Sequence, residues 1–146
     1  MPLPALLELI AAWVAADLGV PIPAMMPGVA FADQRTMERL RLMSETEPVE
    51  EGNREADLVA FYETRGKTIY LPLGWQGRSY AELSVLVHEM VHHFQVLAEE
   101  RFACPSGREK LPYEVQRRWL EAHGESLEET LGIDPLYLIV ATNCLP

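Results

Sequence analysis

Apolar residues recur every three or four positions from Ala81 to Glu100, a segment without glycine or proline. This spacing predicts an α-helix. At about 100° per residue, the apolar side chains point in many directions around its axis. They are Leu83, Leu86, Val87, Met90, Val91, Phe94 and Leu97. A helix that is apolar on most sides belongs in a protein core, so we expect the rest of the chain to pack around this one.

The chain before this helix predicts two further helices and a short strand. Helical spacing covers Leu3–Leu18, where Gly19 is a suitable C-cap. Three prolines interrupt the chain between residues 20 and 27, and Gly28–Ala32 then has the composition of a strand. Asp33 is a suitable N-cap for a second helix, Gln34–Met43.

A β-hairpin is predicted between the second helix and the central one. The acidic segment Ser44–Ala56 is typical of a surface loop. Two apolar runs follow, Leu58–Tyr62 and Thr68–Leu73, with Gly66 in the turn between them. Pro72 cannot donate a hydrogen bond to a neighbouring strand, which favours an edge position for the second run. A free sheet edge can bind an extended peptide through main-chain hydrogen bonds.

After the central helix the pattern predicts mainly helix. One helix is expected from about Glu109 to His123, a short one over Ser126–Leu131, and a last apolar segment over Leu136–Ala141. Asp134 and Pro135 are a suitable N-cap and first helical residue for that last segment. No repeat or domain boundary is visible, so we predict one α+β domain over residues 1–146, with a small antiparallel or mixed sheet.

Length and charge narrow the functional classes. A chain of 146 residues is long enough for one domain with a hydrophobic core. Its net charge of −10 argues against nucleic-acid or anionic-membrane binding, which require basic surfaces. No run reaches the roughly 18 apolar residues of a membrane span. The sequence carries no signal of oligomeric state.

The compartment depends on the two cysteines and on the N-terminus. The apolar stretch Leu3–Val14 has no basic flank and contains Glu8, so we interpret it as a helix of the fold and expect a cytoplasmic protein. Cys104 and Cys144 do not form a C-x-x-C pair. If they bridge and a signal peptide has been removed, the protein is instead periplasmic or secreted.

The central helix carries the sequence His88-Glu89-Met-Val-His92. Two histidines four residues apart lie on one face of a helix, within reach of one metal ion. Buried imidazoles and carboxylates are costly without partners, and zinc is the simplest partner for this set. The alternative is a chance spacing of two core or surface histidines.

A catalytic zinc requires a third protein ligand and an open position for water. Glu109 and Glu114 are the candidates, because the next helix carries both. On a helical projection Glu109 lies on the apolar arc and Glu114 on the polar one, which favours Glu109. Glu114 remains the second choice, and Glu109 has an alternative role in a capping box with Ser106. Pro112 argues against that box, since it would then lie too deep in the helix.

Glu89 is adjacent to a predicted ligand but points about 100° away from it around the helix. A carboxylate there is suited to take a proton from a zinc-activated water and deliver it to the leaving amine. A surface salt bridge is the alternative role, and the apolar character of the helix disfavours it.

The His-Glu-Met-Val-His sequence, with Gln95 one turn on, resembles the active-site helix of gluzincin-type zinc metallopeptidases, above all small one-domain bacterial members. The resemblance covers roughly residues 58–124. It implies a zincin-like fold, zinc bound by His88, His92 and a downstream glutamate, and Glu89 as catalytic base. It also implies that the strand Thr68–Leu73 lies along a peptide substrate, through residues Thr68, Ile69, Tyr70 and Leu71.

The sequence departs from that family at two points. Large gluzincins often carry an aspartate four residues after the glutamate ligand, where this chain has Tyr113. They also have a separate lobe whose histidine or tyrosine stabilises the transition state, and this sequence shows no such lobe. Tyr113 itself could serve that catalytic role, and the alternative is that it is a packed core residue. The main rival hypothesis is a zinc-stabilised scaffold or pseudo-enzyme that binds a protein partner; a metal-sensing or redox protein has weaker support.

Overall fold

The computed structural model describes residues 1–43 and 60–145, which form six helices and three strands. In chain order these are α1 (Leu3–Leu18), β1 (Gly28–Ala32), α2 (Gln34–Met43), β2 (Phe61–Glu63), β3 (Thr68–Pro72), α3 (Tyr80–Leu97), α4 (Pro105–Ala122), α5 (Leu127–Leu131) and α6 (Pro135–Thr142). The architecture is α+β, as predicted. The predicted acidic loop Ser44–Ala56 lies outside the described residues.

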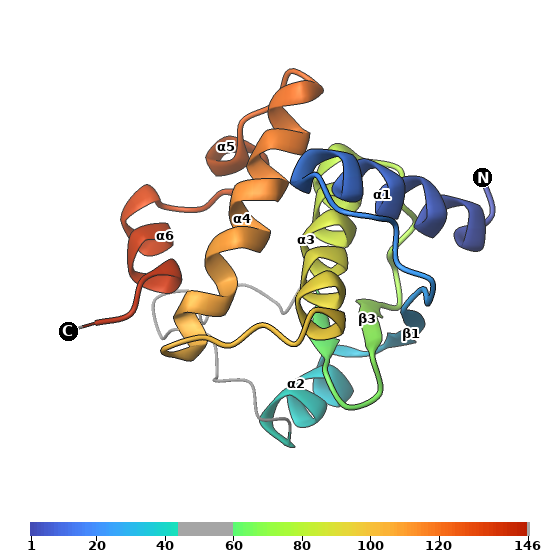
Figure 1. The fold of residues 1–146 in the computed structure, drawn as a ribbon, viewed down its shortest axis with the longest axis horizontal. Helices are drawn as coiled ribbons and strands as arrows, with labels where there is room; N and C mark the ends of the chain where they lie inside the picture. The colour runs from blue at the N-terminus through green and yellow to red at the C-terminus, as the bar shows by residue number, and fades with distance from the viewer. Residues whose placement is uncertain (44–59, 146) are drawn as a thin grey trace.

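The central helix α3 is buried along most of its length, as its apolar pattern predicts. It begins after Ser79, whose hydroxyl accepts a hydrogen bond from the Glu82 amide at 3.0 Å. Every residue from Ser84 to Gln95 is buried. In Figure 1, α4 and α6 lie to one side of α3, and the sheet lies to the other, with α1 crossing near the top. The core therefore surrounds the helix that carries both candidate zinc histidines.

The sheet has the order β1-β3-β2, so β3 is its central strand and the predicted edge position is wrong. The hairpin itself is confirmed, since β2 and β3 pair antiparallel with Glu63 opposite Thr68. The parallel pairing of β1 with β3 is not predicted by the local sequence pattern. Pro72 is tolerated because it is the last residue of β3, opposite Ala32 at the end of the ladder.

The expected substrate contacts of β3 are lost with its edge. Thr68, Ile69 and Tyr70 are paired with strands on both sides, and Leu71 is paired with Phe31 of β1. The side chains of Ile69 and Leu71 are buried in the core. The backbone of these four residues is therefore engaged within the sheet, and β3 does not offer a free edge to a peptide.

A buried polar link fastens the sheet to α3. The hydroxyl of Tyr62 in β2 lies 2.8 Å from Nδ1 of His93, and Nε2 of the same ring lies 2.8 Å from the Met25 carbonyl oxygen. A carbonyl only accepts, so Nε2 carries the proton and Nδ1 accepts from Tyr62. His93 is thus a fully buried structural residue that connects three segments.

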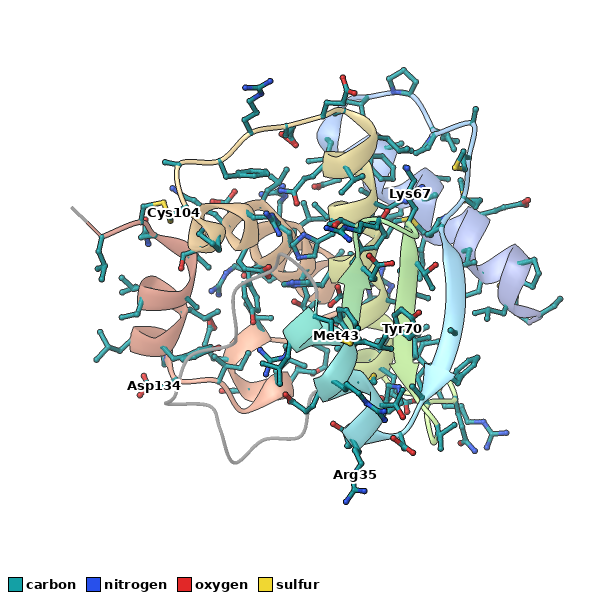
Figure 2. The ribbon with its side chains drawn as sticks, turned by 90° about the horizontal axis from the view of Figure 1, so that it is seen from below. Arg35, Met43, Lys67, Tyr70, Cys104 and Asp134 are labelled. Carbon is teal, nitrogen blue, oxygen red and sulfur yellow. A yellow bond between two sulfur atoms is a disulfide. The ribbon has the colours of Figure 1, made fainter. Side chains whose placement is uncertain are left out.

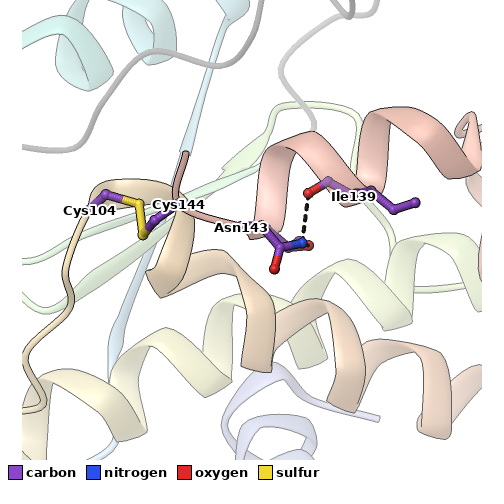
Figure 3. Close-up of a disulfide and its surroundings, with 5 residues drawn as sticks. Cys104, Ile139, Asn143 and Cys144 are labelled. Carbon is purple, nitrogen blue, oxygen red and sulfur yellow. Dashed lines mark hydrogen bonds between the residues drawn. A yellow bond between two sulfur atoms is a disulfide. The ribbon is translucent and has the colours of Figure 1, made fainter. Parts of the chain in front are cut away.

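A disulfide on the helical side of the molecule joins Cys104 to Cys144 (Figure 3). The two Cα atoms are 5.8 Å apart, so the bridge that the sequence left open is formed. Beside it, the amide of Asn143 donates to the Ile139 carbonyl at 2.8 Å and closes the end of α6. Figure 2 shows Cys104 and Asp134 on this helical side, opposite Lys67 and Tyr70 on the sheet side.

Candidate metal centre

Helices α3 and α4 bring His88, His92 and Glu109 together. Oε1 of Glu109 lies 2.9 Å from Nε2 of His88 and 3.2 Å from Nε2 of His92. One ligand atom from each residue can be chosen so that all three lie within 4.8 Å of one another. Both histidines are only 7% exposed, whereas Glu109 is partly exposed. The three residues predicted as zinc ligands therefore form one cluster.

Helical phase separates the two glutamate candidates as expected. Glu109 faces α3, whereas Glu114 is exposed and lines a groove of about 290 Å³ between α4 and α6. The beginning of α4 differs from the prediction: the helix starts at Pro105 with Cys104 as N-cap, four residues early. Glu109 is therefore beyond the first turn, which excludes the capping box with Ser106.

Pro112 lies in the interior of α4, whereas a helix that begins near Glu109 would place it in the first turn. A proline there has no N–H for the carbonyl of residue 108. That carbonyl accepts a hydrogen bond from Gln95 Nε2 at 3.1 Å instead. A side chain of α3 thus satisfies the carbonyl that the interior proline leaves without its helical partner.

The donor set fits a zinc ion. Two imidazole nitrogens and one carboxylate are the protein ligands of several catalytic zinc sites, and three such ligands leave a fourth position for water or substrate. The Nε2 atoms of His88 and His92 both face the carboxylate of Glu109, at 2.9 and 3.1 Å in the shortest ion-pair contacts. When the imidazoles are neutral and their Nε2 atoms carry lone pairs, only a cation can join these three acceptors.

The electrostatics of the metal-free cluster keep Glu109 ionised. Burial by itself would raise the pKa of Glu109, but the adjacent imidazoles of His92 and His88 outweigh it and hold the pKa well below its usual range. Glu89 behaves differently, because burial raises its pKa to about 7. The charge of His88 lowers the pKa of Glu89 and that of Glu109 raises it. The carboxyl group of Glu109 in the cluster and that of Glu89 beside it thus differ in protonation.

Glu89 and Tyr113 flank the cluster. Glu89 is 7% exposed, and among the described residues no hydrogen-bond donor contacts its carboxyl group. The ring of Tyr113 stands edge-on to the ring of His88, with centroids 4.5 Å apart. Burial raises the pKa of Tyr113, as do the charges of Glu109 and Glu89, so its hydroxyl keeps its proton at neutral pH.

Two glutamines that were not predicted as site residues contact the histidines. Gln116 Oε1 lies 2.9 Å from Nδ1 of His88, and Gln95 Oε1 lies 3.0 Å from Nδ1 of His92. The signal was present in the sequence. Gln95 follows His92 by about one turn in a helix that belongs in the core, and Gln116 falls on the apolar arc of α4, where a buried amide must find partners.

Comparison with known families assigns the whole chain. The model for a domain of unknown function, DUF6647, matches residues 1–146. The chain belongs to the DUF6647 family. Comparisons with curated proteins and with solved structures give no match. For this DUF6647 domain, the cluster of His88, His92 and Glu109 is therefore the feature that points to a function, namely metal binding.

Proposed function

We propose that this protein is a zinc-dependent hydrolase that cuts peptide bonds. The observation that carries the proposal is the convergence of His88, His92 and Glu109 beside a second, unshared carboxyl group, that of Glu89. Bound zinc would lower the pKa of a water molecule towards neutrality and so make it a nucleophile at neutral pH. A site with a purely structural metal has no use for an additional buried acid.

Glu89 has the position of a general base. It comes from the same helix as the two histidines, and its charge is close enough to interact with those of His88 and Glu109. It does not belong to the converging ligand set, so its oxygens are available to take a proton from water. The same carboxyl group would then return that proton to the leaving amine.

The peptide bond as substrate rests on the resemblance of the His88–Gln95 segment to the gluzincin helix. Tyr113 is the proposed donor to the oxyanion of the transition state, since it contacts His88 and keeps its proton. This role replaces the separate lobe of larger gluzincins. No part of the proposal depends on β3, whose paired position removes the earlier model for substrate binding.

The test combines metal analysis with a peptide digest. The purified protein is loaded with one equivalent of zinc, incubated with a peptide mixture and analysed by mass spectrometry for new termini. Wild type should hold one zinc and cut, whereas Glu89→Gln should hold zinc equally well and lose activity by at least about 100-fold. Glu121→Gln, an exposed change on α4, serves as the control. Full activity in Glu89→Gln would rule out this mechanism.

A zinc-stabilised scaffold that binds a protein partner is the second candidate. The observation in its favour is that β3 is the central strand of the sheet in the described residues, so β3 does not offer the free edge that we expected beside the metal. Loss of folding on zinc removal, together with no cleavage of any peptide, would support the scaffold. A zinc ion with three protein ligands and one water would support the hydrolase.

The disulfide favours an oxidising compartment, so we propose a periplasmic or secreted location rather than the cytoplasm. Within residues 1–43 and 60–145, no helix is long and apolar enough to span a bilayer. A thiol assay on protein isolated from its native compartment tests the proposal. Free thiols at both Cys104 and Cys144 would argue for the cytoplasm.

A further inference from the structure

The Nδ1 atom of each candidate zinc histidine contacts a buried glutamine. Gln116 of α4 meets His88 at 2.9 Å, and Gln95 of α3 meets His92 at 3.0 Å. The two glutamines are 1% and 3% exposed. Such amides must satisfy both ends of their side chains inside the protein. Where the second end binds decides which way each amide is oriented.

The Gln116 amide is oriented by a chain of hydrogen bonds that ends at a backbone carbonyl. The Ser84 hydroxyl donates to the Ala81 carbonyl at 2.9 Å, and that uses the only proton of the hydroxyl. Ser84 Oγ must therefore accept from Gln116 Nε2, which lies 3.1 Å away. Gln116 Oε1 is left facing His88, so Nδ1 of His88 must donate.

The Gln95 amide is oriented in the same way by the Arg108 carbonyl. That oxygen accepts from Gln95 Nε2 at 3.1 Å, and it is available because Pro112 has no N–H to offer it. The opposite orientation of the amide would place two acceptor oxygens against each other. Gln95 Oε1 therefore faces His92, and Nδ1 of His92 must donate.

His93 provides an internal contrast. Its Nε2–H donates to the Met25 carbonyl and its Nδ1 accepts from Tyr62, so it carries its proton on the other nitrogen. Neighbouring histidines on one helix are thus held in opposite tautomers by their surroundings. Of the three histidines in α3, His88 and His92 have Nε2 atoms without a backbone partner, and both of these atoms face Glu109.

We propose that Gln116 and Gln95 are positioning residues that lock His88 and His92 in the Nδ1–H tautomer and aim their Nε2 lone pairs at one metal ion. The role in metal binding rests on the proposed function, whereas the tautomers follow from the hydrogen bonds alone. Each glutamine acts through a histidine and does not itself belong to the ligand set.

The choice of amides over carboxylates has a chemical consequence. A carboxylate partner makes a ligating imidazole more basic and transfers more negative charge to the metal. A neutral amide orients the ring equally well without that charge. Glu109 is then the one anionic residue among the three candidate ligands, which leaves a bound cation more electrophilic.

The two glutamines differ in how they should tolerate glutamate. In Gln116→Glu the new oxygen faces the Ser84 hydroxyl, which can rotate away from the Ala81 carbonyl and donate to it. In Gln95→Glu the new oxygen faces the Arg108 carbonyl, which cannot donate and therefore repels it. Position 116 should accept glutamate, and position 95 should not.

The experiment measures tautomers and zinc affinity on the same proteins. Two-bond ¹H–¹⁵N spectra of the metal-free protein report which ring nitrogen of each histidine carries the proton. Zinc affinity is measured by competition with a chromophoric chelator. The variants are Gln116→Met, Gln95→Met, Gln116→Glu and Gln95→Glu, with Gln76→Met as the control at an exposed glutamine. Circular dichroism confirms that each variant is folded.

We expect Nδ1–H at His88 and His92 and Nε2–H at His93. Each methionine variant should weaken zinc binding by about 10- to 100-fold, Gln95→Glu should behave like them, and Gln116→Glu and Gln76→Met should stay close to wild type. Absence of the Nδ1 proton at His88 or His92 in the folded wild type, or wild-type affinity in both methionine variants, would overturn the proposal. If wild type binds no zinc but the tautomers are as expected, the proposed function fails while the tautomer assignment stands.

Discussion

The carbonyl oxygen of Arg108 accepts a hydrogen bond from Gln95 Nε2 at 3.1 Å although it lies inside helix α4. In a regular helix this oxygen would bind the amide of residue 112. Pro112 has no such amide, so the residue that interrupts α4 also supplies the acceptor that orients Gln95. The interruption of one helix is thereby connected, through Gln95, to His92 on the other.

Replacing Pro112 by alanine should therefore separate helix stability from metal affinity. The new amide would compete with Gln95 for the Arg108 carbonyl, and zinc affinity should fall by up to about 10-fold. The melting temperature of the metal-free protein should stay equal or rise, since an interior proline disfavours a helix by about 3 kcal/mol. Chelator competition and thermal melts measure the two effects.

Pro135→Ala is the matched control for this prediction. Pro135 is at the beginning of α6, where a missing amide leaves no carbonyl unsatisfied. It should leave zinc affinity unchanged. A Pro112→Ala variant that binds zinc as tightly as wild type would show that Gln95 does not depend on the interruption of α4.

Removing each glutamate candidate should give opposite results. Glu109→Ala should weaken zinc binding by more than about 100-fold, since a ligand matters more than a supporting hydrogen bond. Glu114→Ala should bind zinc like wild type, because its side chain is exposed on the other face of α4. Metal content after dialysis measures both, and zinc loss in Glu114→Ala with retention in Glu109→Ala would reverse the ligand assignment.

The disulfide should contribute to stability and to the metal site. Its cysteines are 40 positions apart, for which the chain-entropy model gives a contribution of about 4 kcal/mol. A Cys104→Ser, Cys144→Ser double variant should lose stability of that order in urea denaturation. Zinc affinity should also fall, because Cys104 is the N-cap of the helix that carries Glu109. Unchanged zinc affinity would show that the disulfide does not position the beginning of α4.

Tyr62→Phe should destabilise the fold without affecting zinc. It leaves Nδ1 of the buried His93 without a donor, which costs about 1–3 kcal/mol in the free energy of unfolding. Tyr70→Phe, the same change on the neighbouring strand at a half-buried site, should stay within about 0.5 kcal/mol of wild type. Equal stability of the two variants in denaturant titrations would contradict the structural role of His93.

Local patterns predicted much of what lies along single helices. The segment around His88 has no residue that breaks a helix, and helical periodicity alone places His92 on the same face. The same periodicity favoured Glu109 over Glu114, since phase within one helix depends only on the residues in that helix. The bounds of α1 and α2 follow from caps at Gly19 and Asp33, where Thr36 donates to the Asp33 carboxylate at 2.7 Å.

The early beginning of α4 shows where local rules end. Pro112 disfavours a helix that starts at Pro105, so the local pattern favours a later beginning. In the folded protein Gln95 satisfies the carbonyl that the proline leaves free, and the disulfide holds the N-cap residue Cys104. A contact from 13 residues away in the sequence is not visible in the α4 segment itself.

The sequence by itself determined the order of the helices, the hairpin, and the helix face on which His88, His92 and Glu109 each lie, because these depend on the spacing of nearby side chains. Only the tertiary structure decided that β1 adds to β3, which turns a predicted edge into the sheet centre. It alone decided the proton positions on His88, His92 and His93 as well. Strand order and tautomers both depend on partners distant in the chain, namely β1 for β3 and the acceptors and donors around each ring, and no local pattern records them.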